Sequence, residues 1–270
     1  MQGKRGLIMG VANDHSIAWG IAKTLAGQGA QLAFTYQGEA LGRRVKPLAE
    51  SVGSNLVMPC DVEDIASVDA VFAEIDKQWG AMDFLVHAIG FSDKNELKGR
   101  YADTSRENFI RTMVISCFSF TEAAKRAGRL MPNGGSMLTL TFNGGDRAMP
   151  NYNAMGLAKA ALEASVRYLA VDFGARKIRV NAISSGPIRT LAGAGIGDAR
   201  MMFAFQQRHS PLHRGVTLDE LGGAALYLLS DLSTGVTGEI HFVDSGYNVI
   251  AMPHPEALRA DREGRDEGGH

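Results

Sequence analysis

The chain has 270 residues, of which 45% are hydrophobic and 21% charged, and its formal net charge at pH 7 is −1. This length and composition allow a large buried core, and the near-neutral charge gives little support to a nucleic-acid partner. No apolar run approaches roughly 18 residues and the start of the chain lacks a signal-peptide pattern, so we expect no membrane span. Cys60 and Cys117 have neither Cys-x-x-Cys nor metal-binding spacing, which predicts reduced thiols in a cytoplasmic protein.

In the first third of the chain, short apolar runs alternate with helical segments. Strands are predicted at residues 5–9, 31–36, 55–59 and 82–87, and helices at 17–26, 39–52 and about 64–79. Ser16 is a candidate cap for the first helix, and Asp61 or Asp64 for the third. This β-α alternation favours a parallel sheet with helices on both faces.

The alternation continues to the end of the last predicted strand. Helices are predicted at residues 105–127, 151–175, 201–208 and 218–230, and strands at 136–141, 178–184 and 240–243. We therefore predict an α/β fold with a Rossmann-like, doubly wound, seven-stranded parallel sheet. A single domain is expected over residues 1–252, with a mobile loop and helix at about 186–210 and a charged, disordered tail at 253–270.

The turn after the first strand has the features of a nucleotide-binding turn. Gly10 and Gly20 enclose the small residues Ala12 and Ser16, and the helix starts at Ile17. Such a turn allows close backbone approach and offers helix N–H groups to a pyrophosphate. A plain structural turn is the alternative, because the stretch lacks the full Gly-x-Gly-x-x-Gly pattern.

The ends of the second and third strands predict an adenosine site. Gln37 follows the second strand and could bind a ribose hydroxyl, whereas Arg43 and Arg44 come later, on a predicted helix. No basic residue lies at the strand tip to meet a 2′-phosphate, so NADH is favoured. Asp61 and Val62 are placed to contact adenine, although Asp61 could instead cap a helix.

Two further strand ends could contribute to the same edge of the sheet. Ala88, Ile89 and Gly90 follow the fourth strand and are compatible with a dinucleotide lying across the sheet. Thr139 and Thr141 in the fifth strand could imitate a catalytic hydroxyl, but ordinary strand threonines are the favoured interpretation.

Tyr152 and Lys159 are the candidate chemical pair. They are seven positions apart, which on a helix returns the second side chain to within roughly 20° of the first. A lysine close to a tyrosine, beside a nucleotide, can make the phenol a better proton donor. The alternative is a solvated pair on a surface helix.

Taken together, these motifs resemble those of the FabI-type enoyl-acyl-carrier-protein reductases, within the short-chain dehydrogenase/reductase superfamily. The resemblance spans roughly residues 3 to 250 and includes the glycine turn, Gln37, Cys60-Asp61-Val62, Ile89-Gly90, Pro150-Asn151-Tyr152-x6-Lys159 and Ser185-Gly186-Pro187-Ile188-Arg189-Thr190. Ordinary superfamily members have Tyr-x3-Lys, whereas position 156 here is Gly.

The resemblance implies NADH-dependent reduction of trans-2-enoyl thioesters carried by acyl-carrier protein, in bacterial fatty-acid elongation. It implies that Tyr152 stabilises the enolate oxygen and that Lys159 holds the nicotinamide ribose. It also implies that Pro187, Ile188 and Thr190 position the nicotinamide and its phosphates. A homotetramer formed through the two long helices is expected on the same ground.

The resemblance further implies an apolar acyl site, with one departure from the family. The residues expected to contact the acyl chain are Phe142, Met155, Ala192, Ile196 and Met202. Phe142 stands where family members usually have a second Tyr, which leaves Tyr152 as the phenol donor that can be assigned.

Two other functions remain open. The first is a short-chain carbonyl reductase, which the Tyr-x6-Lys spacing disfavours. The second is an NAD(H)-binding sensor with degraded chemistry, which Phe142 and a weakly basic carrier-docking helix could support. No metal site is expected at His209 and His213, because Pro211 lies between them and no third ligand is evident.

Overall fold

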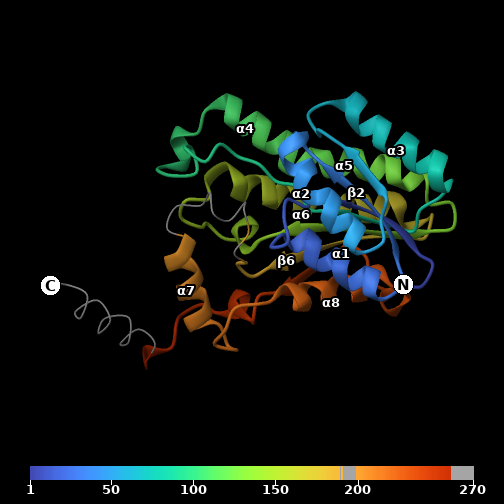
Figure 1. Ribbon diagram of the computed structural model, residues 1–270. Helices are drawn as coiled ribbons and strands as arrows, with labels where there is room; N and C mark the ends of the chain where they lie inside the picture. Colours follow the sequence, from blue (N-terminus) through green and yellow to red (C-terminus); the bar gives the residue numbers. More distant parts are fainter. Residues whose placement is uncertain (189, 191–198, 257–270) are drawn as a thin grey trace.

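Seven parallel strands form one sheet in the computed structural model of the chain, which describes residues 1–188, 190 and 199–256 (Figure 1). The strands are β1 (Arg5–Met9), β2 (Gln31–Tyr36), β3 (Leu56–Pro59), β4 (Phe84–His87), β5 (Gly135–Thr141), β6 (Ile178–Ser185) and β7 (Ile240–Val243). Their order is β3-β2-β1-β4-β5-β6-β7, so the strand order reverses between β1 and β4. The predicted Rossmann-like parallel sheet is confirmed, and ligands of such sheets bind beside this reversal.

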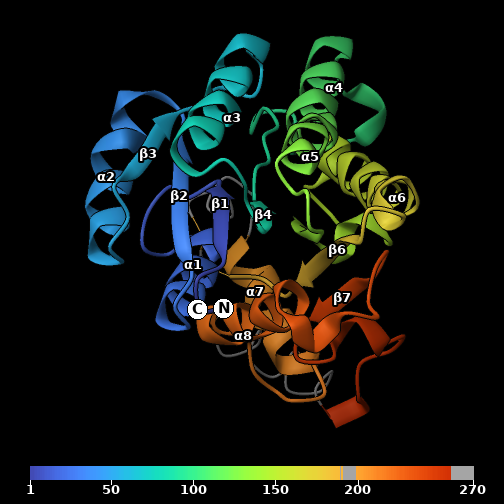
Figure 2. The ribbon, with the colours of Figure 1, turned by 90° about the vertical axis from the view of Figure 1, so that its right-hand side faces the viewer.

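Helices cover both faces of the sheet (Figure 2). One face carries α1 (Ile17–Gly27), α2 (Gly38–Ser51) and α8 (Leu218–Leu229), and the other carries α3 (Ile65–Trp79), α5 (Ser119–Arg129) and α6 (Asn153–Gly174). The remaining helices are α4 (Arg106–Met113) and α7 (Ala199–His209). The described helices include none that is long and apolar enough to cross a membrane.

Each face of the sheet has its own hydrophobic core. Along β1, Leu7 and Met9 pack into the core beneath α3, α5 and α6, whereas Ile8 packs into the core beneath α1 and α8. Leu85 of β4 likewise belongs to the first core and Phe84 to the second. Strands buried on both faces are mostly apolar, which is why near-continuous apolar runs predict them.

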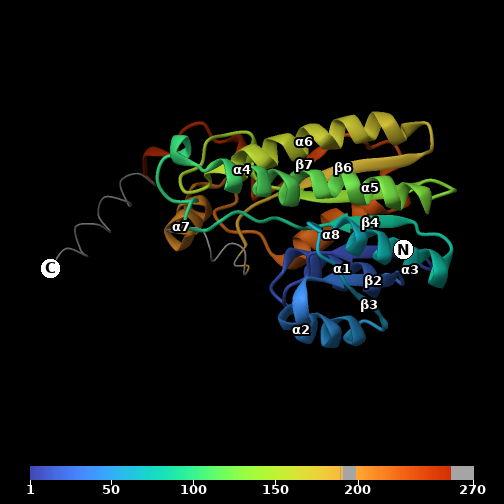
Figure 3. The ribbon, with the colours of Figure 1, turned by 90° about the horizontal axis from the view of Figure 1, so that it is seen from above.

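The helix predicted over residues 105–127 contains a break in its hydrogen-bond pattern. Ser105 caps α4 by accepting a bond from the Asn108 backbone N–H. The chain then forms a π-helical turn, η2 (Val114–Phe118), before α5 begins. Figure 3 shows α4 and α5 following one another along one side of the sheet. A π turn accommodates one additional residue per turn and so re-aims nearby side chains. The predicted long helix is confirmed, since α4, η2 and α5 follow one another without a gap, and the π turn within it was not predicted.

Two helix starts are also more specific than the sequence indicated. Asp64, rather than Asp61, caps α3 by accepting a bond from the Ala66 N–H at 3.0 Å. The helix predicted from residue 151 begins at Asn153, because Asn151 has a left-handed backbone with φ +58°. Tyr152 consequently occupies the N-cap of α6 and not its first turns.

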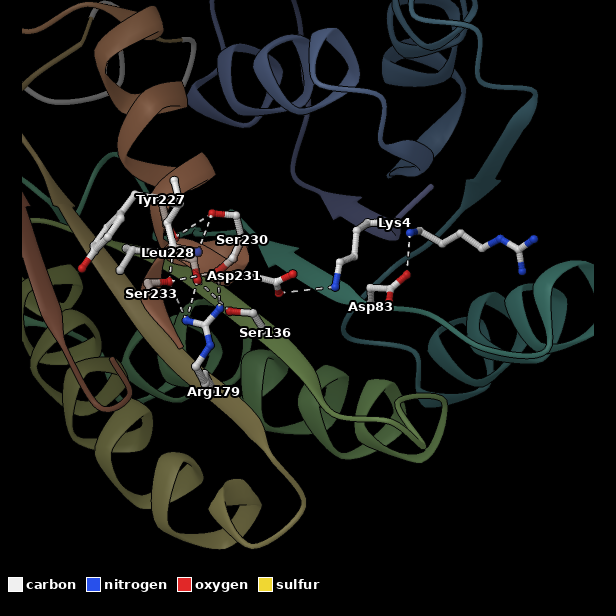
Figure 4. Close-up of polar contacts among 11 residues, drawn as sticks. Lys4, Asp83, Ser136, Arg179, Tyr227, Leu228, Ser230, Asp231 and Ser233 are labelled. Carbon is white, nitrogen blue, oxygen red and sulfur yellow. Dashed lines mark hydrogen bonds and ion pairs between the residues drawn. The ribbon is translucent and has the colours of Figure 1, made fainter. Parts of the chain in front are cut away.

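Polar bonds join several elements at the amino ends of the strands (Figure 4). This edge of the sheet is opposite the carboxyl ends, where ligands of such sheets bind. The guanidinium of Arg179 donates to the backbone oxygens of Leu228, Ser230 and Val236 and to the Ser233 hydroxyl, at 2.7 to 3.3 Å. One cation thus satisfies the carboxyl end of α8 and the turn after it. By contrast, the Lys4–Asp231 ion pair at this edge is long, at 3.5 Å, and solvent-exposed.

Replacing Arg179 by Met should lower the free energy of unfolding by about 2 to 4 kcal/mol, because several partly buried acceptors lose a charged donor. Lys4→Met, the matched control at the same edge, should cost about 0.5 kcal/mol or less. Urea unfolding at fixed protein concentration measures both values. Equal losses in the two variants would contradict the role given to Arg179.

A buried histidine connects β4, β5 and α5 beneath the carboxyl end of the sheet. His87 is fully buried, with Nε2 2.8 Å from the Ser119 hydroxyl and Nδ1 3.3 Å from the Thr139 hydroxyl. Burial, and secondarily the charge of Lys159, lower the pKa of His87 to about 3. His87 is thus a hydrogen-bonded residue of the fold, and Thr139 serves the same cluster by donating to the His87 carbonyl.

His87 should make the protein less stable in mild acid. In the folded chain the ring stays neutral, whereas in the unfolded chain it takes up a proton below its ordinary pKa of about 6.5. The free energy of unfolding should therefore fall as the pH drops from about 6.5 towards 3, by at most roughly 1.4 kcal/mol per pH unit.

Urea unfolding between about pH 5 and 7.5 tests this contribution. His87→Gln should flatten the pH dependence, while His254→Gln, an exposed control, should leave it as in the wild type. An unchanged slope in His87→Gln would show that this histidine does not contribute.

Candidate active site

The glycine turn between β1 and α1 lies directly against the loop that follows β4. Gly10 has φ +101°, and a Cβ there would lie 2.1 Å from the backbone oxygen of Ala88. The Ser16 hydroxyl accepts bonds from the N–H groups of Ala12 and Asn13, at 3.0 and 3.1 Å. Ser16 occupies the N-cap of α1, as predicted, but its side chain makes no capping bond and instead shapes the turn.

The two residues predicted for adenosine binding meet in space. The side-chain amide of Gln37, after β2, donates to Asp61 Oδ2, after β3, at 3.0 Å. Asp61 Oδ1 also accepts the Glu63 N–H at 3.0 Å, and Val62 is buried beside it. Since Asp64 caps α3, Asp61 can serve the nucleotide site, and its carboxylate would repel a 2′-phosphate.

A serine that sequence analysis missed holds the loop after β4. Ser116, in the π turn, accepts a bond from the Phe91 N–H at 2.8 Å and donates to the Phe91 oxygen at 2.9 Å. These two bonds fix the loop that contains Ala88, Ile89 and Gly90. The sequence shows only a serine within an apolar helical run, so no local signal marked its function.

Tyr152 is 8% exposed, and its ring packs against other residues of the site. It lies edge-on to Phe142, with ring centroids 5.2 Å apart. Asn151 and Asn153 on either side have positive φ angles of 58° and 33°, a conformation that asparagine tolerates better than most residues. Burial, and secondarily the charge of Glu163, raise the pKa of Tyr152, so the phenol stays protonated and can donate a hydrogen bond.

Lys159 lies on α6 with its ammonium buried at the end of β5. Its Nζ donates to the backbone oxygen of Leu140 at 2.8 Å. A Cβ added to Gly90 would lie 3.8 Å from this Nζ, 3.8 Å from Ser116 Oγ and 3.9 Å from Met155 Cε. Burial lowers the pKa of Lys159 to about 8. The structure thus brings Gly90, Met155 and Lys159 together, as predicted residues of one site.

A cavity of about 490 Å³ separates the glycine turn from α7. It is lined by His15, Pro187, Ile188, Phe203, Ala204, Gln207, Val216, Thr217 and Leu218. Thr190 donates its N–H to the Ile188 oxygen at 2.8 Å, and Met202 is partly buried on α7. Ala192 and Ile196, predicted to contact the acyl chain, lie outside the described residues, as does most of the loop predicted to be mobile.

Thr141 and the histidines at the end of α7 make contacts within the fold. Thr141 donates to Glu163, so it serves a contact within the fold. The described ranges contain no group of three or more His, Cys, Asp or Glu arranged to hold a metal. His209 packs against the Phe205 ring, with centroids 4.1 Å apart, and His213 Nδ1 lies 3.1 Å from the Arg208 oxygen.

Known proteins of similar sequence and fold are described as the same kind of enzyme. The sequence profile of the enoyl-(acyl carrier protein) reductase family matches residues 10–248. A protein named enoyl-[acyl-carrier-protein] reductase [NADH] 2, from Rhizobium meliloti, is 74% identical over 259 residues, which cover 96% of this chain and 97% of the relative. A second R. meliloti protein, named as reductase 1, is 61% identical over 95% of this chain and 94% of its own length.

Solved structures agree with these sequence matches. FabI from Candidatus Liberibacter asiaticus aligns with a TM-score of 0.92 at 62% identity, covering 94% of this chain and 98% of that one. The Anaplasma phagocytophilum enoyl-acyl-carrier-protein reductase, solved in complex with NAD, aligns with a TM-score of 0.91 at 58% identity, covering 94% and 97%. The matches extend over the glycine turn and the Tyr152–Lys159 helix, so this chain belongs to the enoyl-acyl-carrier-protein reductase family.

Proposed function

We propose that this chain catalyses the NADH-dependent reduction of trans-2-enoyl-acyl-carrier-protein thioesters to saturated acyl thioesters, in bacterial fatty-acid elongation. The observation that carries the proposal is the buried Tyr152 phenol, whose raised pKa keeps it protonated. Lys159 follows seven positions later and lies beside Gly90, in the loop after β4. Relatives that are 55% to 74% identical are named NADH-dependent enoyl reductases.

The residues present fit a dinucleotide. A side chain at Gly10 would fill the approach between the glycine turn and Ala88, and Gly90 leaves room beside Lys159. When bound, NADH would supply a hydride to the β-carbon of the enoyl group, and uptake of a proton at the α-carbon would complete the saturated product. The residues proposed to hold it are Gly10, Ala12, Ser16, Ile17, Gln37, Asp61, Val62, Ala88, Ile89, Gly90, Lys159, Pro187, Ile188 and Thr190.

Tyr152 and Lys159 divide the chemistry between them. As negative charge develops on the thioester oxygen, the neutral Tyr152 phenol donates a hydrogen bond to it. Burial strengthens this interaction because little water competes for the phenol. Lys159 is proposed to bind the nicotinamide ribose hydroxyls, and its ammonium adds positive potential where the enolate forms.

The acyl chain is proposed to occupy an apolar site around Tyr152. Phe142 supplies an aromatic wall against the Tyr152 ring, and Met155 Cε lies near Gly90. Met202, Ala192 and Ile196 remain predicted contacts from the α7 side. Because Phe142 has no hydroxyl, Tyr152 would act as the phenol donor alone.

The acyl-carrier protein that bears the substrate and further copies of this chain are the proposed partners. Arg214 is a basic residue that an acidic carrier could contact. Its charge is already paired within the chain, because Glu220 binds it bidentately at 2.6 and 3.0 Å.

For assembly, we propose a homotetramer that pairs α4, α5 and α6 with the same helices of other copies. Large apolar side chains are exposed on these helices and the π turn between α4 and α5, namely Ile110, Phe118, Leu157, Tyr168 and Val171. A cytoplasmic location and a single domain over residues 1–252 stay part of this proposal.

Tyr152→Phe should lower kcat for enoyl thioesters by a factor on the order of 10² or more, because it removes the hydrogen bond made in the transition state. NADH affinity should change little, since the ring and its packing remain. Steady-state kinetics and NADH fluorescence titration measure the two effects. Tyr227→Phe, on α8, is the matched control, and comparable turnover in the two variants would contradict the role of Tyr152.

Phe142→Tyr should change kcat by less than about threefold, because Tyr152 already supplies the donor that matters. The double variant Phe142→Tyr/Tyr152→Phe should be as slow as Tyr152→Phe. Kinetics of the four proteins form a double-mutant cycle. Recovery of turnover in the double variant would mean that a phenol at position 142 can perform the reaction.

A further inference from the structure

Glu163 lies one helical turn beyond Lys159 on α6, and the pair binds consecutive residues of β5. The Thr141 hydroxyl donates to Glu163 Oε1 at 2.6 Å, while Lys159 donates to the Leu140 oxygen at 2.8 Å. Side chains four positions apart share a helix face, which is why neighbouring residues of one strand can bind both. The active-site helix is therefore joined to the end of β5 by two polar bonds.

The segment after β5 links Glu163 to Tyr152. This segment is η3 (Asn143–Gly145), which follows Phe142 directly. A Cβ on Gly144 would lie 2.5 Å from Tyr152 Cδ1, and a Cβ on Gly145 would lie 2.8 Å from Glu163 Oε1. Two adjacent glycines thus rest on the Tyr152 ring and on the Glu163 carboxylate, so both side chains lie on the same short stretch of backbone.

The charges around Glu163 leave it as the principal anion acting on Lys159. Burial raises the pKa of Glu163 and the Thr141 bond lowers it. The neighbouring charges are Asp146, which follows η3, and Arg167 and Lys159 of α6. Burial lowers the pKa of Lys159, which Cys117 and Glu163 both oppose. However, burial raises the pKa of Cys117, so near neutral pH its side chain is an uncharged thiol.

We propose that Glu163 is a positioning residue for the enoyl reduction: its carboxylate supplies the negative charge that balances the Lys159 ammonium, and its bond to Thr141 fixes the strand end leading to Phe142. This inference rests on the proposed function, because it assigns Lys159 to cofactor binding. Lys159 and Glu163 are each bound to β5, so the carboxylate acts through its field and not through a direct ion pair.

Binding of NADH alone tests the charge role without any turnover. In the wild type, affinity should fall as the pH rises through about 8, where Lys159 loses its proton. Glu163→Gln keeps an acceptor for Thr141 but removes the charge, so the fall should move to lower pH. The Kd for NADH at pH 8 should then rise about two- to threefold relative to the wild type, with little change near pH 6.5.

Matched variants separate charge from shape. Glu163→Asp keeps the charge and should keep the wild-type midpoint, and Thr141→Val should keep the midpoint while lowering kcat, because the strand end is less firmly held. Asp172→Asn removes an exposed carboxylate from the same helix and should shift nothing. Thermal melts at each pH establish that every variant compared is folded.

The proposal is overturned if the midpoint is the same in Glu163→Gln and the wild type, or if Glu163→Asp shifts as far as Glu163→Gln. These outcomes are distinct from failure of the proposed function. A chain that binds NADH with the predicted pH dependence, yet does not reduce enoyl thioesters, would refute the reaction and leave the charge role of Glu163 standing.

Discussion

The bond from the Lys159 ammonium to the backbone oxygen of Leu140 is the contact on which the site depends. It holds α6 at the carboxyl end of β5, so that Tyr152 at the start of the helix lies against the segment that follows β5. Burying an ammonium group costs free energy unless the group is hydrogen-bonded. Lys159 Nζ also lies close to Gly90, in the loop that follows β4. The Lys159 ammonium therefore both fixes the position of α6 and belongs to the proposed cofactor site.

Much of the architecture could be predicted because short stretches of sequence indicate its strands and turns. Strands buried on both faces are continuous apolar runs, and each meets a turn at the edge where ligands bind. Gln37 and Asp61 were assigned to the same adenosine site from separate strand ends, and the structure joins them by a hydrogen bond.

The residues that sequence reasoning missed act through contacts that have no local signature. Ser116 faces the Phe91 backbone only because a π turn interrupts the helix, and an apolar helical pattern does not show that interruption. Glu163 looks like an ordinary helix residue until Thr141 and Gly145 are placed beside it. Ser16, Asp61 and Asp64 are all residue types that can cap a helix. Which of their side chains makes a capping bond depends on backbone geometry and not on residue type.

We expect the site to reduce a carbon–carbon double bond and not a ketone. The most direct measurement is NADH oxidation with crotonyl and longer trans-2-enoyl carrier-protein thioesters, beside the matching β-ketoacyl thioesters, with NADPH in parallel. The enoyl substrates should be turned over with NADH. Turnover of the β-ketoacyl substrates without enoyl turnover would contradict this expectation.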